Sequence, residues 1–495
     1  MFTSPEYYAA LVAALGLFYA TPAKARVFCL LAISCLFYLA IAPAWFPLLA
    51  AEAGITYLVG IALSRAQTDR ARNLLLLCGL VPIVGALLVL KLAGALQGLL
   101  MPLGASYYTF KLISYLLEVY WDETMVAPDF VEFAAFVSFA PQMVSGPIQR
   151  SHQFLRQVPH LRRGWFDPDQ FEAGFFTILR GLLLKLLIAD RLGAFISVVD
   201  AAPQAYLRSV LFTVVLCYTV QLYADFAGYT LIAIGIGRLF GIESPPNFNA
   251  PFSATNMQVF WRRWHITLSS WVADYVFTPL SLSLRGLGRV GMVASLTISM
   301  ILIGLWHGLS YTFLVFGALQ GLYISASVLT TPYRERLVAR FMALPPVHLV
   351  VGLHISSVTV SLPAQLPERR ELGQMAVLAP LRTAFGMLLV YAMVSFSMIF
   401  WQAHTFDAAI LHLRLLARTI PTGHLGFTDI RTDIVDPVFA CMVIAFWHGA
   451  GAPGFAWVAR HVGGVVPRWV IGGVALLLIC ALTTEEGSSF IYGQF

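Results

Sequence analysis

The longest stretch without a charged side chain covers 44 residues, from 290 to 333. About 20 apolar residues in a helix are enough to cross the hydrocarbon core of a bilayer. The stretch is therefore too long for one membrane span and predicts two spans or a broken pair. Similar shorter runs, 73–90, 437–459 and 469–484, each predict one span, and the 25 residues from 27 to 51 predict one tilted helix.

The composition excludes a water-soluble protein. Hydrophobic residues make up 59% of the 495 residues and charged residues 11%, against about 25% charged residues in a typical soluble domain. At roughly 40 residues for each span and its loop, the chain has room for about 10–12 transmembrane helices. The sequence thus predicts an all-α polytopic membrane protein, with residues 1–495 forming one membrane-embedded unit.

The positive charge of the chain indicates topology rather than nucleic-acid binding. The net charge is +6, and the basic residues stand in short loops between apolar runs instead of gathering in one soluble region. Such loops mark the cytoplasmic side, and they can also bind anionic lipid or a phosphate-bearing donor. The strongest loop signal is a basic stretch, Arg150, Arg156, Arg162 and Arg163, followed by Arg180, Lys185 and Arg191.

Several segments do not have the pattern of a simple span. Residues 136–148 are apolar but contain two prolines and a glycine, which predicts a re-entrant or broken segment. Residues 244–252 contain three prolines and are expected to be irregular. The more polar segments 361–382 and 402–436 are expected to lie on the solvent side or at the membrane interface.

Two histidines stand in apolar surroundings with the same neighbours. His307 follows Trp306 and precedes a glycine deep in the long uncharged run, and His448 repeats this Trp-His-Gly pattern. A polar side chain at such depth is costly, so it is a functional candidate by default, and imidazole is suited to proton transfer. The alternative is a histidine that is hydrogen-bonded within a helix bundle.

A second cluster combines charge with tryptophan. Arg262 and Arg263 stand between Trp261 and Trp264, and His265 follows. The pattern is typical of an interfacial anchor, with guanidinium groups at lipid headgroups. The same two arginines can also bind a phosphate through paired hydrogen bonds. The two interpretations are compatible with each other.

Asp225 is a lone carboxylate after 16 residues without charge. It is expected to face the protein interior and to pair with another group. It either orients a catalytic histidine or ties two helices together. The six cysteines have no metal-like spacing, so no metal site is expected. The sequence contains no Gly-rich phosphate loop, and no tightly bound cofactor is expected.

At this point the motifs resemble a known family. The segments PLGASYYTFKLISYLLEVY, YADFAGY, PPNFNAPF, FWRRWHITLSSW and IGLWHG follow one another between residues 102 and 330. In this order they are similar to the membrane-bound O-acyltransferases, in particular to the bacterial branch that acts in alginate O-acetylation and teichoic-acid D-alanylation. Residues 102–330 would then form the motif-bearing catalytic core.

The resemblance implies many helices around a central cavity and transfer of an acyl group from a thioester to a hydroxyl. The catalytic histidine of the family corresponds to His307, and a second family histidine corresponds to His265. His448 lies outside the matching segments. The supporting residues would be Asp225, Trp306, Asn247 and Asn249, with Arg262 and Arg263 binding the donor.

We therefore expect an inner-membrane O-acyltransferase of a bacterium, and specifically an O-acetyltransferase for an exported polysaccharide. The donor would be acetyl-CoA or an acyl carrier, and the partners would be membrane lipid, an extracytoplasmic acetyltransferase- or esterase-like protein and a polysaccharide biosynthesis complex. The alternatives are carrier-dependent transfer of D-alanine, a transporter or flippase without chemistry, and a structural scaffold.

Overall fold

The computed structural model describes residues 4–97, 102, 104–164, 166–342, 369–403, 405–417 and 473. The elements of this part of the chain are helical, with no strand among the described residues. The helices of its first third are α1 Pro5–Ala20, α2 Arg26–Ile41, α3 Phe46–Arg65, α4 Asp69–Gln97, α5 Ala105–Trp121, α6 Phe130–Ser138, α7 Ala140–Met143, α8 Ser151–Leu155 and α9 Val158–Arg163.

The remaining described helices include two π-helical segments, η4 and η7, each continuous with its neighbours. In chain order they are α10 Pro168–Leu182, η4 Leu183–Ala189, α11 Asp190–Asp200, α12 Arg208–Leu239, α13 Met257–Trp261, α14 Ile266–Val272, η7 Ala273–Phe277, α15 Thr278–Ser283, α16 Gly288–His307, α17 Tyr311–Met342, α18 Arg369–Gln402 and α19 Phe406–Ala417.

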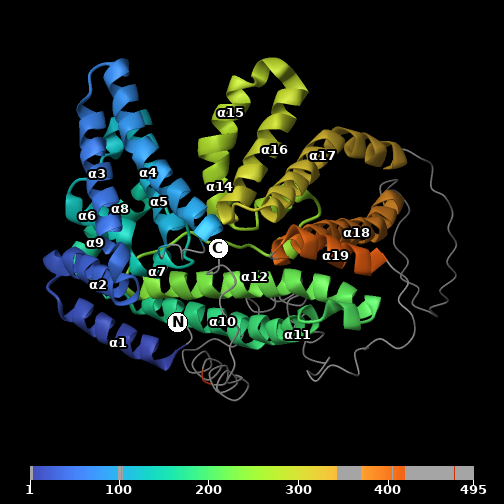
Figure 1. Ribbon diagram of the computed structural model, residues 1–495, viewed down its shortest axis with the longest axis horizontal. Helices are drawn as coiled ribbons and strands as arrows, with labels where there is room; N and C mark the ends of the chain where they lie inside the picture. Colours follow the sequence, from blue (N-terminus) through green and yellow to red (C-terminus); the bar gives the residue numbers. More distant parts are fainter. Residues whose placement is uncertain are drawn as a thin grey trace.

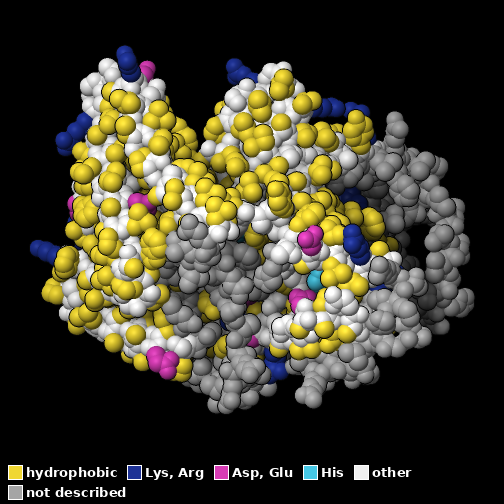
Figure 2. All heavy atoms as spheres, in the orientation of Figure 1, with side chains coloured by type: hydrophobic (Ala, Val, Ile, Leu, Met, Phe, Trp, Pro, Cys, Tyr) yellow, Lys and Arg dark blue, Asp and Glu magenta, His cyan; other side chains and the backbone are white. Residues whose placement is uncertain are grey.

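Seven segments of the described chain are long and apolar enough to cross a membrane. They are Ala23–Ile41, Pro43–Arg65, Asp69–Leu96, Arg208–Leu239, Arg285–His307, Tyr311–Tyr333 and Leu381–Gln402. Figure 2 shows apolar side chains over the outer faces of two arms, one formed by α3 and α4 and the other by α15 and α16. Lys and Arg side chains lie at the tips of both arms. The chain is a multi-pass membrane protein.

The helices form three groups around α12 (Figure 1). The helices α1–α9 lie together at one end, α10 and α11 run alongside α12, and α14–α16 rise above it next to α17. α12 contacts α10, η4, α11 and α18, and most of its residues are buried. A helix that is apolar on all sides is stable in such a central place because protein surrounds it.

Glycines allow α10 to approach α12 closely. A Cβ atom on Gly181 would lie 2.6 Å from the carbonyl oxygen of Gly228, and one on Gly235 would lie 2.6 Å from that of Gly174. Both contacts are shorter than any real Cβ contact, so only glycine fits at these places. Small residues at helix crossings allow this backbone contact inside membranes.

The structure confirms four expectations about the elements and corrects two. Residues 290–333 form two helices, α16 and α17, that pack against each other. Residues 136–148 are broken at Phe139, between α6 and α7, and 244–252 are irregular. The run 73–90 lies within the single helix α4.

The expected single helix over 27–51 is wrong. α2 ends at Ile41, a 3₁₀ turn covers Pro43–Trp45, and α3 begins at Phe46. Pro43 and Pro47 occupy the first turns of the two following elements, where proline is tolerated but the preceding helix cannot continue.

The solvent-loop interpretation of the basic stretch is wrong for two of its residues. Arg150 and Lys185 are buried, at 6% and 1% exposure. Lys185 forms ion pairs with Asp190 at 2.6 Å and with Asp225 of α12 at 2.8 Å. A buried lysine is stable here because carboxylates from its own helical run and from α12 compensate its charge.

The two expected excursions are described only in part. Residues 369–382 are the first part of α18, whose later part is a candidate span, and residues 406–417 form α19. Residues 361–368 and 418–436 lie outside the described residues, and so do the expected spans 437–459 and 469–484 and the residue His448.

Candidate active site

His265 is held at the start of α14 by the proline-rich loop. Its Nδ1 lies 3.0 Å from Oδ1 of Asn247, and since an amide oxygen only accepts, Nδ1 is the donor. Oδ1 of Asn247 also accepts from the backbone nitrogen and the hydroxyl of Thr267, at 3.2 and 2.9 Å. Asn247 thus determines the tautomer of His265 and leaves Nε2 as its basic nitrogen.

The backbone at His265 has φ = 42°, in the left-handed region that favours glycine. Hydrogen bonds between residues 247–249 and 263–266 hold this conformation: the nitrogen of Ile266 donates to the Asn247 carbonyl, and that of Asn249 to the Arg263 carbonyl. Burial lowers the pKa of His265 to about 3. The imidazole is therefore neutral at pH 7, with a nitrogen that can accept a proton or a hydrogen bond.

His307 is the last residue of α16 and is 5% exposed. Its ring contacts Trp306, with ring centroids 4.5 Å apart, and Trp401 of α18, at 4.3 Å. The chain leaves the helix at Gly308, where a Cβ atom would lie 2.6 Å from the ring of Phe313. Glycine thus allows α17 to pack directly beside the histidine.

Trp306 joins the two histidines. The centroid of its ring lies 6.2 Å from that of His265 and 4.5 Å from that of His307. The fold therefore brings together two imidazoles that are 42 positions apart in the sequence.

Lys91 of α4 is a third group at this place, and the sequence analysis missed it. It is buried, at 8% exposure, and lies close enough to His307 for the two side chains to interact electrostatically. It is the only charged residue between Arg72 and Lys111. Its isolated position in the sequence could have indicated a functional lysine. However, Lys91 directly follows the uncharged run 73–90, as a charged residue at the end of a membrane span does.

An aromatic stack leads away from Trp306. The ring of Phe110 in α5 stacks on Trp306 at 5.3 Å and on Trp271 of α14 at 4.1 Å. Nε1 of Trp271 donates to the Phe110 carbonyl at 3.1 Å. The stack fixes α5, α14 and α16 relative to one another. This stacking could not be predicted from the sequence, because single aromatic residues are common in apolar segments.

The other residues that the sequence predicted for the site differ in their burial and in the contacts that they make. Asn249 and Arg262 are exposed. Arg263 Nη1 contacts the Ser253 hydroxyl and the Ala250 carbonyl, so Arg263 stabilises the proline-rich loop. Asp225 pairs with Lys185 and so ties α12 to η4, one of the two roles open from the sequence. The next residue, Phe226, presents its ring edge-to-face to His265 at 4.7 Å.

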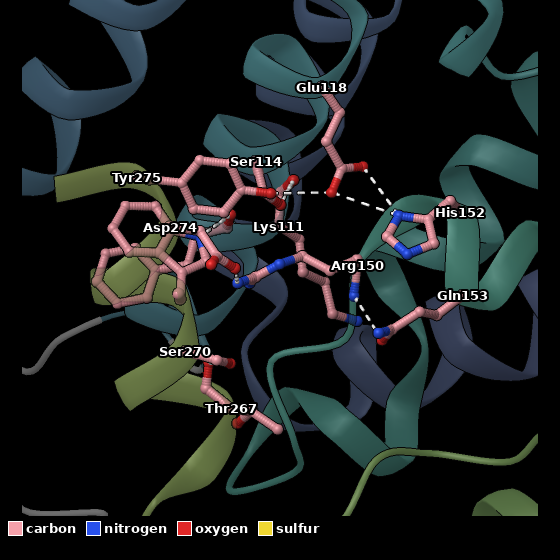
Figure 3. Close-up of polar contacts among 12 residues, drawn as sticks. Lys111, Ser114, Glu118, Arg150, His152, Gln153, Thr267, Ser270, Asp274 and Tyr275 are labelled. Atoms are coloured by element: carbon pink, nitrogen blue, oxygen red, sulfur yellow. Dashed lines mark hydrogen bonds and ion pairs between the residues drawn. The ribbon is translucent and has the colours of Figure 1, made fainter. Parts of the chain in front are cut away.

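A polar cluster lies at the far end of the α14–η7 segment (Figure 3). Glu118 of α5 accepts hydrogen bonds from Tyr275 of η7 at 2.9 Å and from Ser151 of α8 at 2.8 Å. Arg150 lies over the ring of Tyr275 and pairs with Asp274 at 3.1 Å. The sequence analysis did not single out Glu118, Tyr275 or Asp274.

Comparison with known proteins identifies the class to which this fold and site belong. The family model described as MBOAT, membrane-bound O-acyltransferase family, matches residues 121–347. This range contains both histidines, the proline-rich loop and Trp306, but neither Lys91 nor Trp401.

Two curated relatives match a longer part of the chain than the family model does, and a third matches a part of similar length. The chain is 33% identical over 340 residues to the "Probable alginate O-acetylase AlgI" of Pseudomonas aeruginosa, covering 63% of this chain and 62% of the relative. It is 32% identical over 336 residues to the protein of that name from Pseudomonas putida, covering 63% and 67%. A "Teichoic acid D-alanyltransferase" of Streptococcus thermophilus is 31% identical over 237 residues, covering 46% and 56%.

The helical membrane architecture and these matches define a polytopic membrane protein with two buried histidines from separate motifs. The chain belongs to the membrane-bound O-acyltransferase family. It spans less than two thirds of the length of the Pseudomonas aeruginosa relative.

Proposed function

We propose that this chain is an O-acyltransferase of the bacterial inner membrane that acetylates an exported polysaccharide. The observation that carries the proposal is the pair His265–His307, buried and joined through Trp306. The names of the alginate O-acetylase relatives support an acetyl group and a polysaccharide acceptor. The donor is a cytoplasmic thioester, acetyl-CoA or an acyl carrier.

His307 is the general base. It takes the proton of the acceptor hydroxyl while the hydroxyl oxygen attacks the thioester carbonyl, the carbon–sulfur bond breaks, and the thiolate leaves and is protonated. The acceptor is a sugar hydroxyl or a hydroxyl of an extracytoplasmic partner protein that passes the acyl group on.

His265 and Lys91 act on the same centre. His265 is held neutral by burial and oriented by Asn247. Its Nε2 accepts a hydrogen bond from a reacting group and so polarises that group. Lys91 stabilises the negative charge that develops on the carbonyl oxygen, because a cation in a low-dielectric site acts more strongly than in water. Arg262, which is exposed, contacts the phosphates of the donor.

A direct test compares the ester content of the host's exported polysaccharide among wild type, His307→Ala and His412→Ala at matched membrane levels. His412 of α19 serves as the control because its partner is Asp200 rather than Trp306. Loss of a general base lowers the rate by about 10²–10⁴-fold. Full acylation with His307→Ala would exclude the proposed chemistry and favour a transporter or a scaffold.

The second candidate is carrier-dependent transfer of D-alanine, favoured by the similarity to a teichoic acid D-alanyltransferase. Mass spectrometry of the ester separates the two. An added acetyl group supports acetylation, and an added alanyl group supports the alternative with the same catalytic residues. Purified protein that cleaves radiolabelled acetyl-CoA would further identify the donor.

A further inference from the structure

The place of His265 depends on one continuous helical segment. His265 is the residue before α14, and α14 continues into the π-helical segment η7, which ends at Phe277. A π-helical segment in an α-helix shifts the register of the residues on either side. The contacts that hold this segment along its length therefore determine where the imidazole lies.

Near the histidine, contacts from two other elements hold the segment. The Thr267 hydroxyl accepts a hydrogen bond from the backbone nitrogen of Ile148 at 3.0 Å. One turn further on, Trp271 stacks on Phe110 of α5 and donates to its carbonyl. The segment is thus attached to α5 and to the stretch before α8.

At its far end the segment is attached to the same two elements. Figure 3 shows Tyr275 pointing toward Glu118, with Arg150 beside the tyrosine ring. Tyr275 donates to Oε1 of Glu118, and the other carboxylate oxygen accepts from Ser151 and lies 3.4 Å from Nδ1 of His152. The guanidinium carbon of Arg150 lies 4.7 Å from the ring centroid of Tyr275.

These contacts have the properties of a rigid clamp. The side chain of Glu118 is 11% exposed and that of Arg150 is 8% exposed, so solvent screens the contacts little. The hydrogen bonds from Tyr275 and Ser151 to the Glu118 carboxyl group are 2.9 and 2.8 Å long, within the normal range for a hydroxyl donor. The clamp consists of Glu118, Arg150 and Tyr275.

We propose that Glu118 and Tyr275 are positioning residues for acyl transfer, which keep α14 in the register that places His265 beside Trp306 and His307. They touch neither histidine and act through the helix. The reason for the coupling is geometric, because the reacting groups of an enzyme must be held to within a fraction of an ångström. The inference rests on the proposed function.

The test compares two Tyr→Phe variants that each remove one hydroxyl. Tyr275→Phe removes the hydrogen bond to Glu118, and Tyr120→Phe removes one to Asn73, made by the last turn of α5 away from α14. With labelled acetyl-CoA as the probe, we expect kcat of Tyr275→Phe to fall by about tenfold with KM within about twofold of wild type. Tyr120→Phe should keep the wild-type values. Equal kcat for the two variants would overturn the inference.

A conservative variant separates positioning from folding. Glu118→Gln keeps an oxygen that accepts from Tyr275, so it should retain most of the turnover, whereas Glu118→Met, of similar length, should lose it. If Glu118→Met fails to fold, the comparison of Tyr275→Phe with Tyr120→Phe still decides. Turnover of Glu118→Met equal to that of Glu118→Gln would contradict the clamp.

Hydrogen exchange tests the clamp without any activity. Backbone amides of residues 266–272 should exchange faster in Tyr275→Phe than in wild type, and at the wild-type rate in Tyr120→Phe. Unchanged exchange in Tyr275→Phe would refute the clamp even in an active protein. A wild-type protein that transfers no acyl group would instead refute the proposed function, and the exchange result would stand independently.

Discussion

The buried lysine of η4 gives the sharpest test of the fold. Lys185 Nζ lies 2.6 Å from Asp190 Oδ1 and 2.8 Å from Asp225 Oδ1, and the side chains are 2%, 4% and 1% exposed. Lys185→Met preserves much of the volume but removes the cation that both carboxylates contact. Two buried negative charges then lose this compensation.

The magnitude follows from the burial of the three groups. Removing one partner of a buried ion pair costs about 3–5 kcal/mol, because the charge left behind has lost both its water and its counter-ion. With two carboxylates affected, we expect the free energy of unfolding to fall by at least about 4 kcal/mol. Changing both carboxylates to amides as well, with Asp190→Asn and Asp225→Asn, should recover most of this loss.

The assay is unfolding by SDS in mixed detergent micelles, followed by tryptophan fluorescence. Glu123→Gln is the matched control, because its ion pair with Arg72 is 3.5 Å long and its side chain is 62% exposed. Such surface pairs contribute about 0–1 kcal/mol. If Lys185→Met lay within about 1 kcal/mol of wild type, or if the amide variants gave no recovery, the reasoning on buried charge would be refuted.

Two further predictions concern stability. Gly181→Ala should lower the melting temperature, because the added Cβ lies 2.6 Å from the Gly228 carbonyl oxygen, whereas Gly85→Ala, with nothing within 4 Å, should not; equal melting temperatures would contradict close α10–α12 packing. For His265, the folded pKa of about 3 lies below the unfolded value of about 6.5, so the unfolded state binds more protons between these values. Stability should therefore fall as the pH drops below about 6.5, by up to about 1.4 kcal/mol per unit from this group. The melting temperature of His265→Gln should fall less between pH 7 and pH 5.5 than that of wild type, and parallel curves would show that His265 does not titrate as inferred.

The spans could be predicted where the sequence signal is local. The uncharged run 290–333 predicted two helices from its length, and the prolines of 136–148 and 244–252 predicted breaks. The prediction of one helix over 27–51 failed, because it rested on the absence of charge and did not take Pro43 and Pro47 into account. Proline ends a helix whether or not the surrounding residues are apolar.

The site could be predicted in part. The motifs pointed to His265, His307, Trp306 and Asn247, and the structure brings these four together. They did not point to Lys91, Trp401 or Glu118, which come from other helices. Arg150 and Lys185 were assigned to a loop by their charge, because sequence alone does not show whether a basic residue meets water or a buried carboxylate.

The sequence by itself determined that this chain is an all-α membrane protein, because a bilayer requires each span to satisfy its backbone hydrogen bonds locally. Run length and charge, both local properties, are enough to show it. Only the tertiary structure decided which side chains meet. Lys185 and Asp225, Trp306 and His265, and Tyr275 and Glu118 are each far apart in the chain. Their contacts depend on the packing and register of whole helices, which no single segment encodes.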